Sequence, residues 1–164
     1  MRRLETLILD PRVVLEAKSL RIVYTPLHGT GGVIIKTMLT RLGFNFQVLP
    51  EQDCFDGRFP TVKSPNPEYS EALTLAINLA EKEDADLVVA TDPDCDRMGV
   101  AVRTKDGKMK LLTGNQIGSL LAWYRIKTLF EKSVLDRQNA ARAVIIKTLV
   151  TTDLHNTKIG RAHV

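Results

Sequence analysis

Hydrophobic residues follow two spacings along the first part of the chain, and these spacings predict alternating strands and helices. The stretches 20–26 and 86–90 are short apolar runs that predict buried strands. The stretch 44–50 alternates apolar and polar residues and predicts another strand. Within 35–42 and 67–83, apolar residues recur at the i, i+3, i+4 spacing of one helix face. Strands that alternate with helices in this order are typical of an α/β domain.

Turn-forming residues mark the ends of these elements. The segment "HGTGG" at 28–32 is a glycine turn between the first strand and the first helix, and Gly43 supplies the C-cap of that helix. Asn66 is expected as the N-cap of the next helix, with Pro67 at its first helical position. Glycine and proline residues spread over 51–67 predict a long irregular loop, a kind of segment that is often functional.

The second half of the chain predicts a hairpin, a capped helix and one more strand. Apolar stretches on either side of Asp106-Gly107 indicate a β-hairpin. Thr113 and Gln116 have the spacing of a capping box, so a helix is expected to begin there. A polar linker at 131–142 then precedes the strand-like run "AVIIK" at 143–147.

The predicted fold class is an α/β layered domain with a mostly parallel or mixed sheet flanked by helices, followed by the truncated start of a second α/β domain. The boundary is placed near 111, because the capped helix begins a new unit. Both ends of the chain look like cut edges, which indicates a fragment. The expected parts are the tail of a preceding element at 1–19, an α/β domain at 20–110, the start of a second domain at 111–158, and a non-native tail at 159–164, where "IGRAHV" looks like a translated sequencing adapter.

Composition and charge narrow the classes of function. Of 164 residues, 44% are hydrophobic and 26% are charged, as in an ordinary globular domain. The formal charge of +4 is modest and no basic run occurs, so nucleic acid is not an expected partner. The longest apolar stretches are too short to cross a bilayer, so no membrane partner is expected. Two cysteines without a CxxC spacing are expected to be reduced thiols, and the expected location is cytoplasmic.

The segment "DPDCDR" places Asp92, Asp94 and Asp96 at every second position, directly after an apolar strand, with Arg97 beside them. An extended chain points such residues to one side. Unit charges about 4 Å apart repel by about 1 kcal/mol in water and by about 4 kcal/mol at an effective dielectric of about 20, and a cation relieves this repulsion. Oxygen ligands select Mg²⁺, Mn²⁺ or Ca²⁺, and three carboxylates leave room for phosphate and water, as Mg²⁺ sites do. Arg97 can hold a phosphoryl group bidentately.

Other interpretations of this segment are open. It can be a solvated turn whose charges never meet. An EF-hand loop from Asp92 would need glycine where Arg97 stands and glutamate where Arg103 stands, so that interpretation fails at two positions. A haloacid-dehalogenase-type phosphatase also places D-x-D after a strand, with the first aspartate as nucleophile. That analogy is partial, since threonine or valine is expected where Asp96 stands.

Five segments carry motifs that together are more specific than any one of them: "IVYTPLHGTGG", "FPTVKSPNPE", "DADLVVATDPDCDRMGVAV", "LLTGNQIGSLL" and "VIIKTLVTT". In this order they resemble the phosphoglucomutase/phosphomannomutase branch of the α-D-phosphohexomutases. The resemblance covers about 20–152 and points to that branch's second, metal-binding domain and to the opening of its third, sugar-binding domain. It implies an enzyme that moves a phosphoryl group between O1 and O6 of a hexose, by way of a phosphoserine and a bisphosphorylated intermediate.

The resemblance also implies roles for individual residues. Asp92, Asp94 and Asp96 would bind a Mg²⁺ ion that also touches the phosphoserine oxygen, and Arg97 would be the catalytic residue that contacts phosphoryl or substrate oxygens. For other positions an ordinary structural role is the alternative. These weaker candidates for substrate or phosphate binding are His28 and Gly29 at the glycine turn, Lys63 in the long loop, and Lys147 at the end of the last predicted strand.

Three of the family's four functional segments do not occur in this sequence: the phosphoserine loop, the sugar-reading loop and the terminal phosphate-binding loop. The expected function is therefore that of a fragment of a Mg²⁺-dependent phosphohexose mutase, of the phosphoglucomutase type, which is inactive alone. Its expected partners are a hexose phosphate and the missing domains of the same chain. An alternative from another class is a catalytically silent Mg²⁺- or phosphate-binding domain that acts through a partner.

Overall fold

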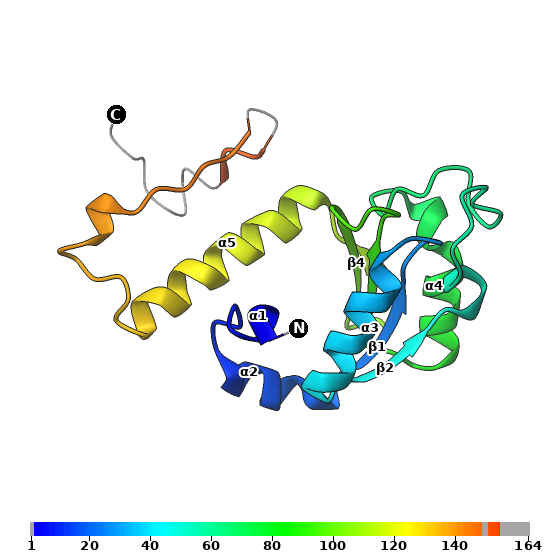
Figure 1. Cartoon of the computed structure of the whole chain (residues 1–164), viewed down its shortest axis with the longest axis horizontal. Coiled ribbons are helices and arrows are strands. Elements are labelled where there is room, and N and C mark those ends of the chain that lie inside the picture. Colours follow the sequence, from blue (N-terminus) through cyan, green and yellow to red (C-terminus); the bar gives the residue numbers. More distant parts are fainter. Residues whose placement is uncertain (1, 149–150, 155–164) are drawn as a thin grey trace.

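A single mixed sheet of five strands lies at the centre of the computed structural model, which describes residues 2–148 and 151–154 (Figure 1). The strand order is β2-β1-β3-β4-β5. The first three of these strands run parallel, and β4 and β5 join antiparallel at one edge. The strand bounds are β1 (Arg21–Thr25), β2 (Asn45–Val48), β3 (Leu87–Thr91), β4 (Met98–Arg103) and β5 (Met109–Leu111).

Helices α3 (Gly31–Leu42) and α4 (Ser70–Lys82) cover the two faces of this sheet, and α5 (Gly114–Glu131) extends away from it (Figure 1). Side chains alternate between the faces of a strand, so Val23 and Tyr24 of β1 point to opposite sides. Val23 belongs to the core beneath α4, and Tyr24 lies beneath the start of α3 next to Gly31. The helix bounds are α1 (Arg2–Glu5), α2 (Pro11–Glu16), α3 (Gly31–Leu42), α4 (Ser70–Lys82) and α5 (Gly114–Glu131). The predicted α/β fold with a flanked mixed sheet is confirmed.

The main core lies between α4 and the sheet. Alanine residues on one face of α4 let the helix approach the strands closely, and Leu73 on the same face is fully buried. Their partners on the sheet are equally covered by the helix. The side chains that make up this contact are Ala72, Leu73, Ala76 and Ala80 of α4 with Val23, Val88, Ala90 and Ala101 of the strands.

Most predicted elements of the first half are confirmed, with one correction. Helix α3 ends where Gly43 adopts a left-handed conformation (φ +73°), as a C-cap glycine does. Helix α4, in contrast, starts at Ser70 rather than at Pro67, so the predicted N-cap at Asn66 is wrong. The Asn66 side chain accepts the N–H of Glu68 at 3.0 Å and closes a turn of its own before the helix. Asparagine often competes for local backbone donors in this way.

In the second half, the predicted hairpin and the capping box are confirmed, but the last strand is not. The Thr113 side chain accepts the N–H of Gln116, and the Gln116 side chain accepts the N–H of Thr113. Residues 143–148 form no strand, and Ile146 is 93% exposed. A strand needs a neighbouring strand to accept and donate its backbone hydrogen bonds. No strand of the described chain lies beside residues 143–148 to do so. The predicted tail at 159–164 lies outside the described residues.

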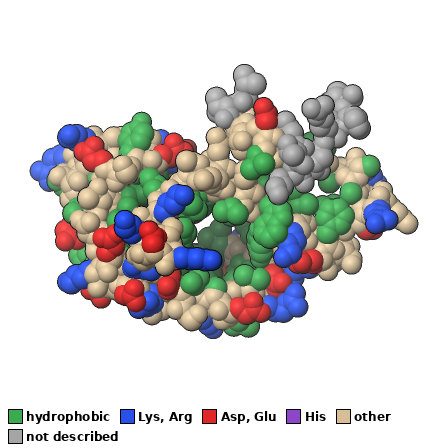
Figure 2. Space-filling view, turned by 180° about the vertical axis from the view of Figure 1, so that it is seen from behind, with side chains coloured by type: hydrophobic (Ala, Val, Ile, Leu, Met, Phe, Trp, Pro, Cys, Tyr) green, Lys and Arg blue, Asp and Glu red, His purple; other side chains and the backbone are tan. Residues whose placement is uncertain are grey.

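Helix α5 and the N-terminal segment border a groove of about 360 Å³ that is lined by apolar side chains such as Leu7, Val13, Leu121 and Tyr124. A hollow bordered by hydrophobic side chains is visible on one face of the molecule (Figure 2). Leu120 and Leu121 are each 55% exposed, so the apolar face of this helix is only partly covered. Within residues 2–148 and 151–154, no helix has the length and apolar character needed to span a membrane.

Candidate metal centre

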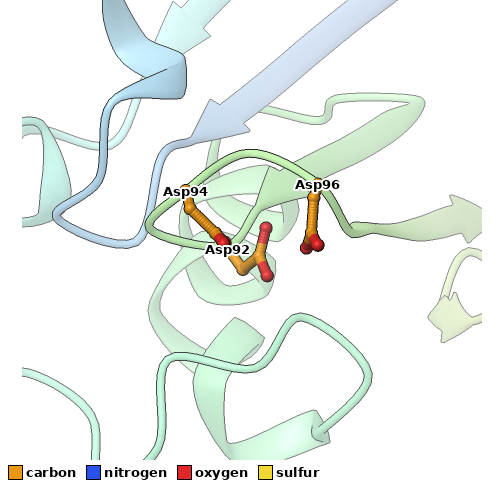
Figure 3. Close-up of side chains that lie close together, drawn as sticks. All are labelled: Asp92, Asp94 and Asp96. Atoms are coloured by element: carbon orange, nitrogen blue, oxygen red, sulfur yellow. The ribbon is translucent and has the colours of Figure 1, made fainter.

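The loop between β3 and β4 brings three carboxylates together. The hydrogen bond from the N–H of Cys95 to the carbonyl of Asp92 closes a tight turn, and Cys95 itself is left-handed (φ +63°). This turn folds Asp94 and Asp96 back toward Asp92 (Figure 3). One oxygen from each of the three carboxylates lies within 4.8 Å of the others. The structure therefore places the predicted ligands close together, with two of the three exposed to solvent as in the alternative of a solvated turn.

Asp92 is the fixed member of the cluster. Its side chain is fully buried at the end of β3, and both of its oxygens accept hydrogen bonds from Arg97. The backbone N–H of Arg97 donates to Oδ1 at 2.9 Å, and its Nε donates to Oδ2 at 2.7 Å. Asp94 and Asp96 are exposed. The cluster is thus anchored on one side and open to solvent on the other.

The charges of the cluster are only partly balanced. The negative charge of Asp94 and the hydrogen bond with Asp92 raise the pKa of Asp96. Burial by itself would raise the pKa of Asp92, but the hydrogen bonds from Arg97 outweigh burial and lower it. Arg97 is the one basic side chain paired with the cluster within the described chain, at 2.7 Å from Asp92 and 3.7 Å from Asp96. One guanidinium does not neutralise three carboxylates, so this all-oxygen donor set fits a divalent cation.

The glycine turn after β1 is packed directly onto this loop. The backbone N–H and the hydroxyl of Thr30 both donate to the carbonyl of Pro93, at 2.8 and 3.0 Å. A Cβ on Gly29 would lie 2.2 Å from the Cα of Pro93, so no larger residue fits there without displacing the loop. The turn therefore supports the metal loop through its backbone. Thr30 and Pro93 were not among the predicted site residues, and their contact joins positions too far apart for a local pattern to reveal.

The backbone N–H groups of residues 28–30 in the glycine turn are all engaged within the protein. The N–H groups of His28, Gly29 and Thr30 donate to the carbonyls of Gln52, Pro26 and Pro93 and so are not available to a phosphate. The imidazole of His28 is buried and bonds Thr61 through Nε2 at 2.8 Å. It has no hydrogen bond to the three aspartates within the described chain. A substrate role for His28 and Gly29 stays a prediction without support from these contacts.

The two candidate lysines are engaged elsewhere in the described chain. Lys63 is 90% exposed, and its Nζ lies 3.8 Å from Glu71. Lys147 does not close a strand as predicted; its Nζ donates to the carbonyl of Thr151 at 3.0 Å and lies 3.4 Å from Asp153. Neither lysine is paired with the aspartates of the metal loop within residues 2–148 and 151–154. The structure thus clusters Asp92, Asp94, Asp96 and Arg97, packs Gly29 against the loop that carries them, and leaves the other three candidates outside.

The comparisons with known proteins agree with this fold. The family model described as phosphoglucomutase/phosphomannomutase, alpha/beta/alpha domain II, matches residues 5–107. The chain is 49% identical over 108 residues to a phosphoribomutase from Saccharomyces cerevisiae, covering 62% of this chain and 17% of the relative. It is 39% identical over 141 residues to a phosphoglucomutase from Staphylococcus saprophyticus, covering 85% of this chain and 24% of the relative.

A solved structure gives the same result. A phosphoglucomutase/phosphomannomutase family protein from Burkholderia thailandensis superposes with a TM-score of 0.56 at 28% identity, over 71% of this chain and 24% of that protein. The chain therefore belongs to the phosphoglucomutase/phosphomannomutase family, within its second α/β/α domain. It spans 17% to 24% of the length of the relatives named here.

Proposed function

We propose that the loop from Asp92 to Arg97 is the Mg²⁺ site of a phosphohexose mutase, of which this chain is a part. The observation that carries the proposal is the convergence of three carboxylates within 4.8 Å. Asp92 would bind from its buried position, and Asp94 and Asp96 from the open side. A bound Mg²⁺ would supply positive charge to the oxygens of a phosphoryl group during transfer.

Arg97 has the second role in this proposal. Its Nε is engaged by Asp92, and its two terminal nitrogens make no hydrogen bond to the described residues. The side chain is 53% exposed, so these two nitrogens can reach a ligand outside the loop. A guanidinium held at one end by a buried carboxylate is well placed to bind and orient a phosphoryl group through the other end. Asp92 would then position Arg97 as well as serve as a ligand.

The proposed reaction in the longer protein moves a phosphoryl group between O1 and O6 of a hexose through a phosphoserine outside this sequence. The chain alone would then bind the cation and turn over no substrate. The hexose phosphate and the missing domains of the same protein are the proposed partners. The named relatives are a phosphoribomutase and a phosphoglucomutase, which supports a sugar phosphate as the substrate class.

Calorimetric titration of the purified chain with MgCl₂ and with MnCl₂ tests the site. We expect weak binding in the original chain and at least tenfold weaker binding after Asp94→Asn, because the loss of one charged ligand lowers cation affinity. Asp106→Asn is the matched control, since Asp106 lies in the hairpin turn at the far end of β4. Equal cation affinities of the two variants would show that the metal site does not lie in this loop.

A phosphate-release assay separates the mutase proposal from the phosphatase alternative. With glucose 1-phosphate and Mg²⁺, we expect no release of phosphate by the chain alone. Release of phosphate that disappears after Asp92→Asn would place phosphatase activity in this loop, and the phosphatase would replace the mutase. For the silent binding domain, the distinguishing measurement is mutase activity of the longer protein with and without Asp94→Asn. Activity that is unchanged by this substitution would favour the silent domain.

A further inference from the structure

Cys54 and His28 form a pair that the metal loop does not use. The Sγ of Cys54 lies 3.4 Å from the Nδ1 of His28. Cys54 is exposed, whereas His28 is only 3% exposed. An exposed cysteine therefore lies beside a buried histidine.

A chain of hydrogen bonds holds the imidazole of His28 in place. Its Nε2 bonds the hydroxyl of Thr61 at 2.8 Å. The same Thr61 oxygen accepts the side-chain N–H of Gln52 at 2.9 Å, and the Gln52 carbonyl oxygen accepts the hydroxyl of Thr25 at 2.6 Å. Gln52 and Thr25 are both fully buried. In the tautomer that carries its proton on Nε2, Nδ1 is left as the acceptor that faces the thiol.

The backbone and nearby charges add to this arrangement. The backbone of His28 is left-handed (φ +64°), and its N–H donates to the backbone carbonyl of Gln52 at 3.0 Å. These two features fix the backbone position from which the imidazole ring extends. The carboxylate of Asp56 has a lowered pKa, mainly through hydrogen bonds from Arg58, and a positive charge on His28 lowers it further. Asp53, next to Cys54, forms an ion pair with Lys36 of α3 at 2.7 Å.

Space for a small reagent lies next to the sulfur. Cys54 lines a cavity of about 70 Å³ together with Gly29 and Phe55, and the Phe55 side chain is 69% exposed. Cys95 differs in each respect: it is only partly exposed, its Sγ packs near Gly31, and no histidine bonds it within the described chain. The two cysteines thus differ in access and in the presence of a base.

We propose that Cys54 is a site of covalent modification by thiol–disulfide exchange with a small disulfide, with His28 as its general base. A nucleophile, a base within hydrogen-bond reach and a third group that orients the base form the arrangement that activates such side chains. Nδ1 of His28 takes the thiol proton as Sγ attacks one sulfur of the disulfide. The S–S bond of the reagent breaks, a new S–S bond to Cys54 forms, and the departing thiolate takes the proton from His28. This proposal is independent of the proposed metal site.

The test measures modification of the purified chain by oxidised glutathione at neutral pH, with each cysteine followed by mass spectrometry. We expect Cys54 to react at least tenfold faster than Cys95 in the folded chain. In 6 M guanidinium chloride, where the pairing with His28 is lost, we expect the two rates to converge. Faster reaction at Cys95, or a Cys54 rate no higher in the folded chain than in denaturant, would overturn the proposal.

Two variants then separate the base from simple exposure. His28→Gln removes the acceptor for the thiol proton and is expected to lower the Cys54 rate about tenfold. Thr61→Val keeps His28 but removes the hydroxyl that orients it, and a smaller loss is expected. Circular dichroism establishes that each variant is folded. If His28→Gln does not fold, the comparison of the folded and denatured Cys95→Ser chain decides, because Cys54 is then its one thiol. An unchanged rate in a folded His28→Gln variant contradicts the role of His28.

Discussion

The sheet unit, residues 21–111, and helix α5 differ in how well they cover their own apolar side chains. In the sheet unit, Leu73 and Val88 are fully buried between α4 and the strands. On α5, Leu120 is 55% exposed and Trp123 is 49% exposed, although the helix has a complete N-terminal cap. Local sequence signals therefore specify the helices and strands of both regions equally well. Only the sheet unit, however, contains the packing partners that cover its apolar faces. An apolar pattern shows which face requires cover and not which element provides it.

The largest expected effect compares one leucine from each region. Leu73→Ala leaves a cavity in the packed core and is expected to lower the free energy of unfolding by about 2–5 kcal/mol. Leu120→Ala removes a side chain that is already half exposed, and a change of at most about 0.5 kcal/mol is expected. Urea unfolding followed by circular dichroism measures both. A similar cost for the two variants would mean that α5 is packed as tightly as the sheet unit.

The next effect is expected where the glycine turn meets the metal loop. Gly29→Ala places a methyl group 2.2 Å from the Cα of Pro93 and is expected to cost about 1–3 kcal/mol through overpacking. Gly57→Ala is the matched control, because a Cβ there meets nothing within 4 Å. The control is expected to be neutral or slightly stabilising. Thermal unfolding compares the two, and equal melting temperatures would contradict the tight contact between the two loops.

The sequence predicts a structural feature well when the interacting residues lie close together along the chain. Gly43 as a C-cap, the Thr113 capping box and the hairpin at Asp106-Gly107 depend on neighbours a few residues away, and all three are confirmed. The clustering of the aspartates was also predictable, because they lie in one tight turn. In each case the responsible atoms belong to a single short segment.

Contacts between distant segments could not be predicted in the same way. The bonds from Thr30 to Pro93 join residues from two different loops, and nothing in either segment alone indicates the other. The same holds for His28, whose ring partners Cys54 and Thr61 come from a different segment of the chain. The strand expected at 143–147 failed for a related reason, since its apolar pattern is present but no described strand pairs with it.

The smallest expected effect concerns Asp10, which lies between the N-terminal segment and the end of α5. Its carboxylate accepts hydrogen bonds from the side chain and backbone of Arg12, and these lower its pKa from 3.8 to about 2. Lys132, just after α5, lies 4.0 Å away. The depressed pKa means that Asp10 stabilises the fold above about pH 4 and that this contribution disappears as the pH falls toward 2.

Asp10→Asn tests this contact because asparagine keeps the N-cap hydrogen bond of α2 but removes the charge. We expect the variant to melt slightly below the original chain at pH 6 and the two melting temperatures to converge between pH 4 and pH 2. The difference should be small, since the Arg12 side chain is 79% exposed and exposed ion pairs contribute little. Lys132→Ala shows whether α5 shares in the effect. If that substitution lowers the melting temperature as much as Asp10→Asn does, charge as well as apolar contact holds α5 to the N-terminal segment. Curves that stay parallel down to pH 2 would instead exclude a lowered pKa at Asp10.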